Sequence, residues 1–361
     1  MLAPAPAWVR NIARAGHVGV TLFFVLSGFI LAYTYFERAD WTARAFWWAR
    51  VARIYPVYAL GFVLYSPHAL KDIFASGVSV HAFLIAAVSA TTAITLTQAW
   101  FPAFALLWNV PAWSLSAEAF FYLLFPWLAR KVARPQISSE RLVVAAGLVW
   151  AVGLLAPAAY MLCKPDGIEQ PIDAENTGFL ISLLKYAPVA HLPEFVVGTI
   201  AGELFLRELR SGAQRGGTIL TFTVCLALLF ALAFSPSIPY PLLHNGILTP
   251  LFAALVYLLA RGRSPIAWLL ALPPMVLLGE ASYAVYLLHL QVAWSERIYA
   301  RVAPVVLRVP TLKFIGHVVP MTLACIAIFL WFETPMRLRL RRLSPTAEPL
   351  RPSVPLSPQE P

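Results

Sequence analysis

Charged residues are scarce in this chain of 361 residues. Asp, Glu, Lys and Arg make up only 12% of the sequence, whereas 60% is hydrophobic and the mean hydropathy is +0.72. Soluble domains carry about a quarter charged residues, and a chain of this size has too little interior to hide so much apolar surface from water. The composition therefore argues against a soluble domain, a disordered chain, a coiled coil and a nucleic-acid-binding protein. Its expected solvent and partner is the lipid bilayer.

Cysteine is also rare, with three widely separated residues, Cys163, Cys225 and Cys325. An odd number at such spacing forms neither a disulfide framework nor a zinc site, so we expect no metal and no bound cofactor. A Walker loop, a Gly-x-Ser-x-Gly elbow, a Rossmann fingerprint and a signal peptide are absent as well. Acidic residues number 17 against 27 basic ones, and we interpret the excess as basic loops that orient membrane helices.

Long hydrophobic runs, by contrast, fill most of the sequence. Runs of about 20 apolar residues predict transmembrane helices at 18–36, 53–70, 80–99, 113–128, 141–161, 179–206, 217–234, 244–260, 268–294 and 312–332. The predicted fold class is all-α, a polytopic helical bundle with about nine to ten transmembrane segments. We expect an extracytoplasmic N-terminal loop at 1–17, a membrane domain at 18–335, and a basic, then Pro-rich, disordered cytoplasmic tail at 336–361.

Charge predicts the orientation of these runs. The basic segments 38–53 and 129–141 should lie in the cytoplasm, and the acidic segment 162–177 outside. Two cytoplasmic segments need an even number of crossings between them, but three apolar runs lie there. One run is therefore expected to be re-entrant or merged with a neighbour, and the Trp- and Pro-rich stretch 100–112 is the candidate for a dip into the membrane. Because residues 1–17 would then lie outside, the chain is expected to start one helix late.

Ionisable side chains inside predicted spans are costly and therefore mark candidate sites. Glu118 shares a helical face with Ser114 and Tyr122, each one turn away. The pattern is typical of a structural carboxylate paired with an arginine, or of one that holds a catalytic base or a substrate.

A second polar face joins Ser282, Tyr286 and His289 at positions i, i+4 and i+7. A histidine can donate, accept or transfer a proton near neutral pH, although a lone helical histidine is more often simply hydrogen-bonded in place. A third site is the pair Arg50 and Arg53, one turn apart at the predicted cytoplasmic edge. Two guanidinium groups there can grip phosphate, or can act as a plain positive-inside anchor.

The segment 16–30 supplies the fourth feature. Ser27 and Gly28 permit close contact between helices, and His17 lies at the predicted outer end, where an interfacial role is favoured over a catalytic one. From the residues alone, an intramembrane enzyme and a transporter are equally compatible with this polar interior.

At these places the chain resembles the membrane acyltransferase 3 family, bacterial O-acyltransferases that modify cell-surface glycans. The matching elements run in family order from 16 to 335: Phe23-Phe24-Val25-Leu26-Ser27-Gly28-Phe29, Arg50-x-x-Arg53-Ile54-Tyr55-Pro56, Trp113-Ser114-Leu115-Ser116-Ala117-Glu118 with Phe121-Tyr122, Leu192-Pro193-Glu194-Phe195 with Gly198, Ser282-Tyr283 with Tyr286-Leu287-Leu288-His289, and Glu333-Thr334-Pro335.

The resemblance implies a multi-pass enzyme of the bacterial inner membrane that moves an acyl group, with acetyl as the expected one, from cytoplasmic acyl-CoA. The acceptor would be a hydroxyl of a surface or exported glycan or glycolipid. The implied roles are donor or substrate binding for Arg50, Arg53, Tyr55, Ser114, Ser282 and Tyr286, and a catalytic part for Glu118 and His289.

The chain departs from the family pattern in two ways. The family's proposed catalytic histidine lies in the helix before the first matching element, with an arginine near that helix's start, and neither has a counterpart here. Many relatives also carry Asp where this chain has Thr21. The alternatives are therefore His289 as the base, a transporter or flippase of acyl groups or glycolipids, and an inactive family member.

Overall fold

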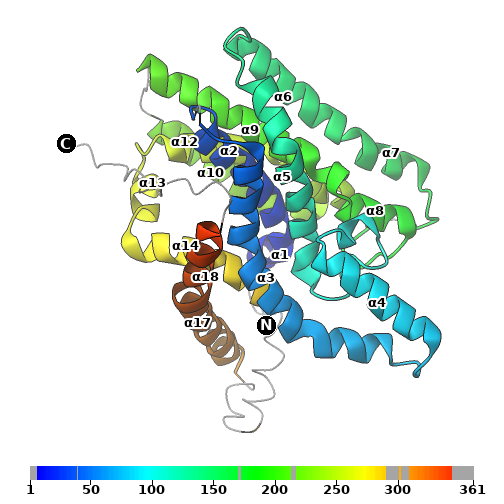
Figure 1. The fold of residues 1–361 in the computed structure, drawn as a ribbon. Helices are drawn as coiled ribbons and strands as arrows, with labels where there is room; N and C mark the ends of the chain where they lie inside the picture. The colour runs from blue at the N-terminus through cyan, green and yellow to red at the C-terminus, as the bar shows by residue number, and fades with distance from the viewer. Residues whose placement is uncertain are drawn as a thin grey trace.

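The computed structural model describes residues 6–38, 40–169, 172–212, 217–289, 301 and 309–343, and all regular structure in these ranges is helical (Figure 1). The first part of the chain forms α1 (Ala7–Arg14), η1 (Ala15–Val18), α2 (Gly19–Tyr35), α3 (Ala43–Ile73), α4 (Val80–Ile94), η2 (Gln98–Trp100), η3 (Val110–Ala112), α5 (Trp113–Val132), α6 (Ser139–Gly153) and α7 (Leu155–Cys163).

The second part forms α8 (Phe179–Tyr186), α9 (Pro188–Ser211), α10 (Thr218–Ala233), η4 (Ser235–Ser237), α11 (Tyr240–His244), α12 (Thr249–Ala260), α13 (Pro265–Leu270), α14 (Pro273–Leu288), α17 (Pro310–Ile328), the π-helical turn η6 (Phe329–Glu333) and α18 (Thr334–Arg342). The predicted all-α membrane fold is confirmed.

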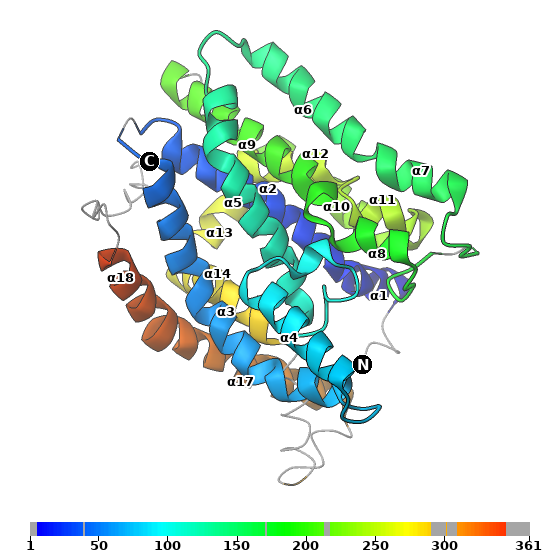
Figure 2. The same cartoon turned by 45° about the vertical axis from the view of Figure 1, so that its right-hand side comes forward.

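Several of these helices suit a bilayer. Five helical segments in the described ranges are long and apolar enough to cross it: Ala7–Tyr35, Ser139–Cys163, Phe179–Ser211, Tyr240–Ala260 and Ile315–Arg342. Each overlaps one of the apolar runs predicted from sequence, whereas the total number of spans stays a prediction. In both views α6 and α7 form one outer edge of the bundle, and α17 and α18 lie on the opposite side (Figures 1 and 2).

Both ends of the domain division need correction. The loop expected at 1–17 is helical from Ala7, because Pro6 occupies the N-cap, where a missing N–H costs nothing, and no further proline or glycine interrupts α1. The tail expected to be disordered from 336 is helical through Arg342, and α18 packs along α3. Residues 344–361 lie outside the described ranges.

The stretch between α4 and α5 has the irregular backbone that was expected. Two short 3-10 helices, η2 and η3, are joined here by turns, and Gln98 Nε2 reaches across to donate to the Ala112 carbonyl oxygen at 2.9 Å. Trp108 Nε1 donates to Ser89 Oγ on α4 at 3.0 Å. These bonds give partners to the buried side chains of Gln98 and Trp108 in this irregular segment. Its depth in the membrane stays a prediction.

The closest helix contact in the described chain joins α2 to α9. A Cβ atom added at Gly28 would lie 2.2 Å from the Phe195 carbonyl oxygen, and one at Gly198 would lie 2.1 Å from the Val25 carbonyl oxygen. One turn further, a Cβ at Gly202 would lie 2.8 Å from the Phe29 carbonyl oxygen. Small residues let membrane helices approach backbone to backbone, which confirms the close contact predicted at Ser27 and Gly28.

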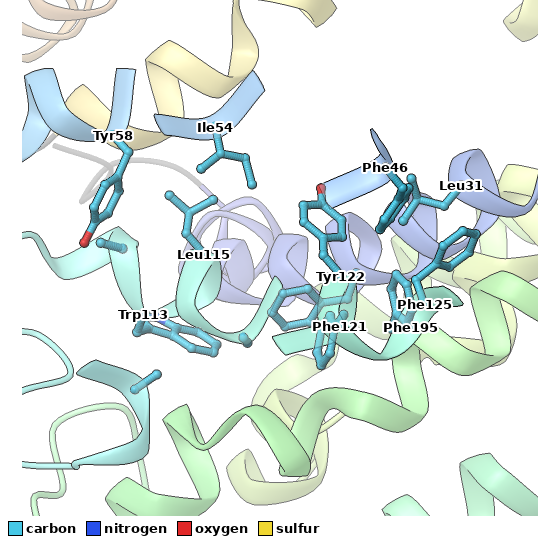
Figure 3. Packing of buried hydrophobic residues seen from close by; sticks show 14 of the residues in the cluster. Leu31, Phe46, Ile54, Tyr58, Trp113, Leu115, Phe121, Tyr122, Phe125 and Phe195 are labelled. Atoms are coloured by element: carbon cyan, nitrogen blue, oxygen red, sulfur yellow. The ribbon is translucent and has the colours of Figure 1, made fainter. Parts of the chain in front are cut away.

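An aromatic core fills the space beside this contact (Figure 3). The rings of Phe121 on α5 and Phe195 on α9 stack with centres 5.0 Å apart, and Phe125 stacks on Phe46 of α3 at 5.0 Å. Phe24 of α2 meets Phe121 edge to face at 5.1 Å. Offset and edge-to-face ring pairs are favourable, so these contacts hold α2, α3, α5 and α9 in one fixed arrangement.

Replacing Gly198 tests the close contact. Gly198→Ala should lower the melting temperature in detergent, because the new methyl group overlaps the Val25 carbonyl and overpacking costs about 1–3 kcal/mol. Gly147→Ala on α6 is the matched control, since a Cβ there meets nothing within 4 Å. Equal melting temperatures for the two variants would contradict the contact.

Candidate active site

A buried carboxylate on α5 lies at the centre of the polar interior. Glu118 is 4% exposed, and its Oε1 accepts hydrogen bonds from the Ser27 hydroxyl at 2.8 Å and the Tyr122 hydroxyl at 2.5 Å. The pairing with Tyr122 follows the predicted one-turn spacing. Arg50 and Arg53 lie close enough to act on Glu118 electrostatically, whereas its hydrogen bonds come from the hydroxyl groups of Ser27 and Tyr122.

We call the end of the bundle at Trp113, where α5 begins, the outer end, and the opposite end the inner end. Arg50 lies at the inner end, next to Tyr122. The Arg50 guanidinium carbon is 5.7, 5.6 and 5.8 Å from the ring centres of Tyr35, Phe46 and Tyr122. Its Nη2 also donates to the Tyr35 hydroxyl at 3.3 Å. Cation–π attraction to three rings therefore holds this guanidinium group in place.

Two further arginines reach this end from α18. We call the four together the arginine cluster: Arg50, Arg53, Arg337 and Arg341. Their charges lie close enough for Arg50 and Arg53 to act on both α18 arginines. Trp48 of α3 fixes α18 here, because its Nε1 donates to the Leu340 carbonyl oxygen at 2.7 Å.

The arginine cluster has polar atoms without partners. Among the described residues, the buried Nε atoms of Arg50 and Arg341 have no hydrogen-bond acceptor. Glu333 at the end of η6 is 1% exposed and lies near Arg53 and Arg337, but its Oε2 also has no donor. A buried polar group without a partner costs about 1–3 kcal/mol, so the cluster is incomplete as it stands and suited to an anionic ligand.

The outer end of α5 meets the second predicted face. The Tyr286 hydroxyl donates to the Pro111 carbonyl oxygen at 3.1 Å and lies 2.8 Å from Ser114 Oγ. His289 Nδ1 is 2.7 Å from the Tyr286 carbonyl oxygen. Because a carbonyl oxygen only accepts, the proton is on Nδ1 and Nε2 is the basic nitrogen. Ser114 and Tyr286 are thus brought together, and the His289 ring lies beside that of Tyr286, with ring centres 6.3 Å apart.

Two of the predicted site residues lie elsewhere. Ser282 is exposed, and its hydroxyl donates to the Gly279 carbonyl oxygen of its own helix at 2.6 Å. The Tyr55 hydroxyl donates to the Ile94 carbonyl oxygen at the end of α4, at 3.0 Å. Tyr55 is turned about 200° around α3 from Arg53, so the two side chains leave opposite faces of the helix.

A second polar cluster, not predicted from sequence, lies at the outer end. We call it the outer cluster: His17, Lys185, His191, Glu194, Tyr240 and His244. Trp113 at the start of α5 packs against it, with its ring centre 5.2 Å from that of His191 and 5.8 Å from that of His244. His191 Nδ1 lies 3.2 Å from Glu194 Oε1. His17, expected at the interface, is half-buried here and stacks on His244 with ring centres 5.7 Å apart.

Comparison with known proteins identifies the family of the chain. The family model described as acyltransferase domain matches residues 2–333. The chain belongs to the acyltransferase 3 family. It is 30% identical to acyltransferase MdmB of Streptomyces mycarofaciens over 294 residues, 78% of this chain and 69% of that protein. It is 29% identical to exopolysaccharide production protein ExoZ of Rhizobium meliloti strain 1021 over 335 residues, 91% of this chain and 92% of that protein. No solved structure matches the chain.

The arginine cluster and the outer cluster each include residues whose place in the sequence could have indicated a site. Arg337 and Arg341 are one turn apart, like a ligand-binding face, but they lie in the stretch predicted to be a disordered tail. Lys185, His191 and Glu194 are ionisable residues inside the predicted span 179–206, where such residues mark function.

Glu118 should hold α2 to α5 in this acyltransferase fold. Glu118→Ala leaves the hydroxyl groups of Ser27 and Tyr122 without their acceptor, which should cost about 1–3 kcal/mol and lower the melting temperature in detergent. Glu118→Gln keeps an oxygen acceptor and should lose less. Glu140→Ala, at the exposed start of α6, is the control; a Glu118→Ala variant as stable as Glu140→Ala would refute the role.

Proposed function

We propose that this chain is a membrane O-acyltransferase that moves an acyl group, acetyl in the first instance, from acyl-CoA to a hydroxyl of an exported glycan or glycolipid. The observation that carries the proposal is the arginine cluster, because it presents unmet donors at one end of a polar interior. The family match supports acyl transfer. The likeness to a protein named for exopolysaccharide production supports a glycan acceptor.

The arginine cluster suits the phosphate groups of CoA. Guanidinium groups bind phosphate oxygens through paired, charge-assisted hydrogen bonds, and several of them together match a ligand with several phosphates. Arg53 is exposed and accessible to the ligand. Arg50 is held by the rings of Tyr35, Phe46 and Tyr122, which we call its ring cage. With the phosphates held there, the thioester arm would run past Tyr122 towards Glu118.

The reaction needs a proton acceptor for the attacking hydroxyl. The acceptor oxygen bonds to the thioester carbonyl carbon as its proton leaves, the carbon–sulfur bond breaks, and the CoA thiolate departs and takes up a proton. A positioned base contributes roughly 10²–10⁴ in rate to such a step. His289 Nε2 is one candidate for this base. His17 is another, because its Nδ1 lies 3.3 Å from the Arg14 carbonyl oxygen, which leaves Nε2 as the basic nitrogen.

Charge also supports a sidedness for the enzyme in a bacterial plasma membrane. We place the arginine cluster on the cytoplasmic side, where acyl-CoA is, and the acidic segment after α7 outside. Cys163, exposed at the end of α7, reports on that side.

In a Cys225→Ser, Cys325→Ser background, an impermeant maleimide should label Cys163 in right-side-out vesicles. Arg339→Cys on the exposed face of α18 should be labelled only in inverted vesicles, after Cys163 has also been replaced by Ser. The opposite pattern would overturn the proposed orientation.

The donor site is tested by kinetics. Arg53→Ala and Arg337→Ala should each raise the KM for acetyl-CoA about 10-fold or more, since a hydrogen bond to a charged group is worth about 1.5–3 kcal/mol and 1.4 kcal/mol is a factor of ten. The kcat should change little, because phosphate contacts lie away from the reacting bond. The measurement is the initial rate of CoA release as the acetyl-CoA concentration is varied.

Arg339→Ala is the matched control, because it removes the same charge from the same helix on its exposed face. An equal rise in KM for Arg337→Ala and Arg339→Ala would show a general charge effect and not a site. A wild-type enzyme that binds acetyl-CoA but never consumes it would favour a transporter.

A further inference from the structure

The outer cluster is built from four separate segments. His17 comes from η1, Lys185 from α8, His191 and Glu194 from α9, and Tyr240 and His244 from α11. Lys185 is 1% exposed and its Nζ donates to the carbonyl oxygens of Ala174 and Asn176, at 2.9 and 2.7 Å. The loop after α7 is thereby tied down beside the cluster.

The Lys185 carbonyl oxygen fixes two of the three imidazole rings. It lies 2.9 Å from His191 Nε2 and 2.9 Å from His244 Nε2. A carbonyl oxygen has two lone pairs and only accepts, so both Nε2 atoms carry protons and donate to it. His244 Nδ1 is then free to accept from the Tyr240 hydroxyl, 3.3 Å away.

The remaining nitrogen of His191 is paired as well. His191 Nδ1 and Glu194 Oε1 lie 3.2 Å apart, and one proton between them satisfies both atoms whichever of the two carries it. Thr21 lies near the Glu194 carboxylate, whose Oε2 is buried without a hydrogen-bond partner among the described residues. His191 and His244 therefore have no nitrogen left for a substrate.

His17 is different. Its Nδ1 lies 3.3 Å from the Arg14 carbonyl oxygen and must donate to it, so Nε2 carries a lone pair. Nε2 is buried and has no partner among the described residues. Of the six ring nitrogens in the outer cluster, this is the one basic atom that the described structure leaves unused. The stacked rings of Tyr240 and His244 hold His17 in place, with ring centres at 5.1 and 5.7 Å.

Resting on the proposed function, we propose that the outer cluster is the acceptor-side proton site, in which His17 Nε2 takes the proton of the acceptor hydroxyl. That proton leaves the oxygen as it bonds to the thioester carbon, the carbon–sulfur bond breaks, and the protonated His17 gives its proton to the departing thiolate of CoA. His17 is the catalytic residue, and Lys185, Tyr240 and His244 are positioning residues. The ligand class is a sugar hydroxyl that enters from the outer end.

The test compares histidine variants of the full chain in nanodiscs, with acetyl-CoA as the donor and methyl glycosides of glucose and galactose as the acceptor probes. His17→Asn retains a donor near the position of Nδ1 and removes the unused nitrogen together with the rest of the ring, so its melting temperature is measured beside its kinetics. We expect its kcat for acyl transfer to fall by roughly 10²–10⁴ while the KM for acetyl-CoA stays the same. Added imidazole should restore part of the rate in His17→Ala.

His81→Gln, exposed on α4, is the control and should keep the wild-type rate. A His17→Asn variant with wild-type kcat, or a loss in His289→Gln alone, overturns the proposal and leaves the proposed function standing. If the His17 variants lose acetyl-CoA binding and imidazole does not restore activity, His17 has a structural role, and the proposal that it is the base is overturned.

Two further measurements distinguish failure of the His17 proposal from failure of the proposed acyltransferase function. If the His17 variants do not fold, wild-type enzyme is treated with diethyl pyrocarbonate. Carbethoxylation of His17 that the glycoside blocks supports the proposal, and inactivation without modification of His17 refutes it. A wild-type chain that releases no CoA from acetyl-CoA with any glycoside contradicts the proposed function itself.

Discussion

The backbone contact between α2 and α9 is the constraint on which the rest of the structure depends. Gly28 and Gly198 let the two helices approach until no side chain fits between them. On α2, Thr21 lies near Glu194 of α9 and Ser27 donates to Glu118 of α5, so two buried carboxylates have hydroxyl neighbours on the same helix. Both carboxylates lie where water cannot solvate them, and each would be costly without such neighbours.

Helix α5 runs the length of the polar interior from one cluster to the other. Its first residue, Trp113, packs on the outer cluster, Glu118 lies in the middle, and Tyr122 faces the ring cage of Arg50. At 3.6 residues per turn, Glu118 and Tyr122 share one face of the helix, whereas Trp113 is turned about 140° from Glu118. The helix therefore links the phosphate-binding end to the proton-accepting end along its length. In the proposed reaction the donor enters at one end and the acceptor at the other.

Local features of this arrangement could be predicted from the sequence. The spacing of Glu118 and Tyr122 follows from helix geometry, and the small residues at Ser27 and Gly28 indicated a close contact. The directions in which the Tyr55 and Ser282 side chains point could not be predicted from their motifs. A sequence motif does not say which neighbouring helix each face of its own helix contacts. The outer cluster depends on four separate segments meeting, and only the fold brings them together. The sequence did not predict helix α18, because its arginines have the pattern of a basic membrane anchor. The packing of α18 on α3 through Trp48 becomes visible only in the fold.

The measurement that tests the central claim most directly is a cryo-electron microscopy structure of the full chain in a nanodisc with CoA bound. The account predicts phosphate density against Arg53 and Arg337, and the thiol end directed past Tyr122 towards Glu118. CoA phosphates bound at the outer cluster, or away from all four arginines, would contradict it.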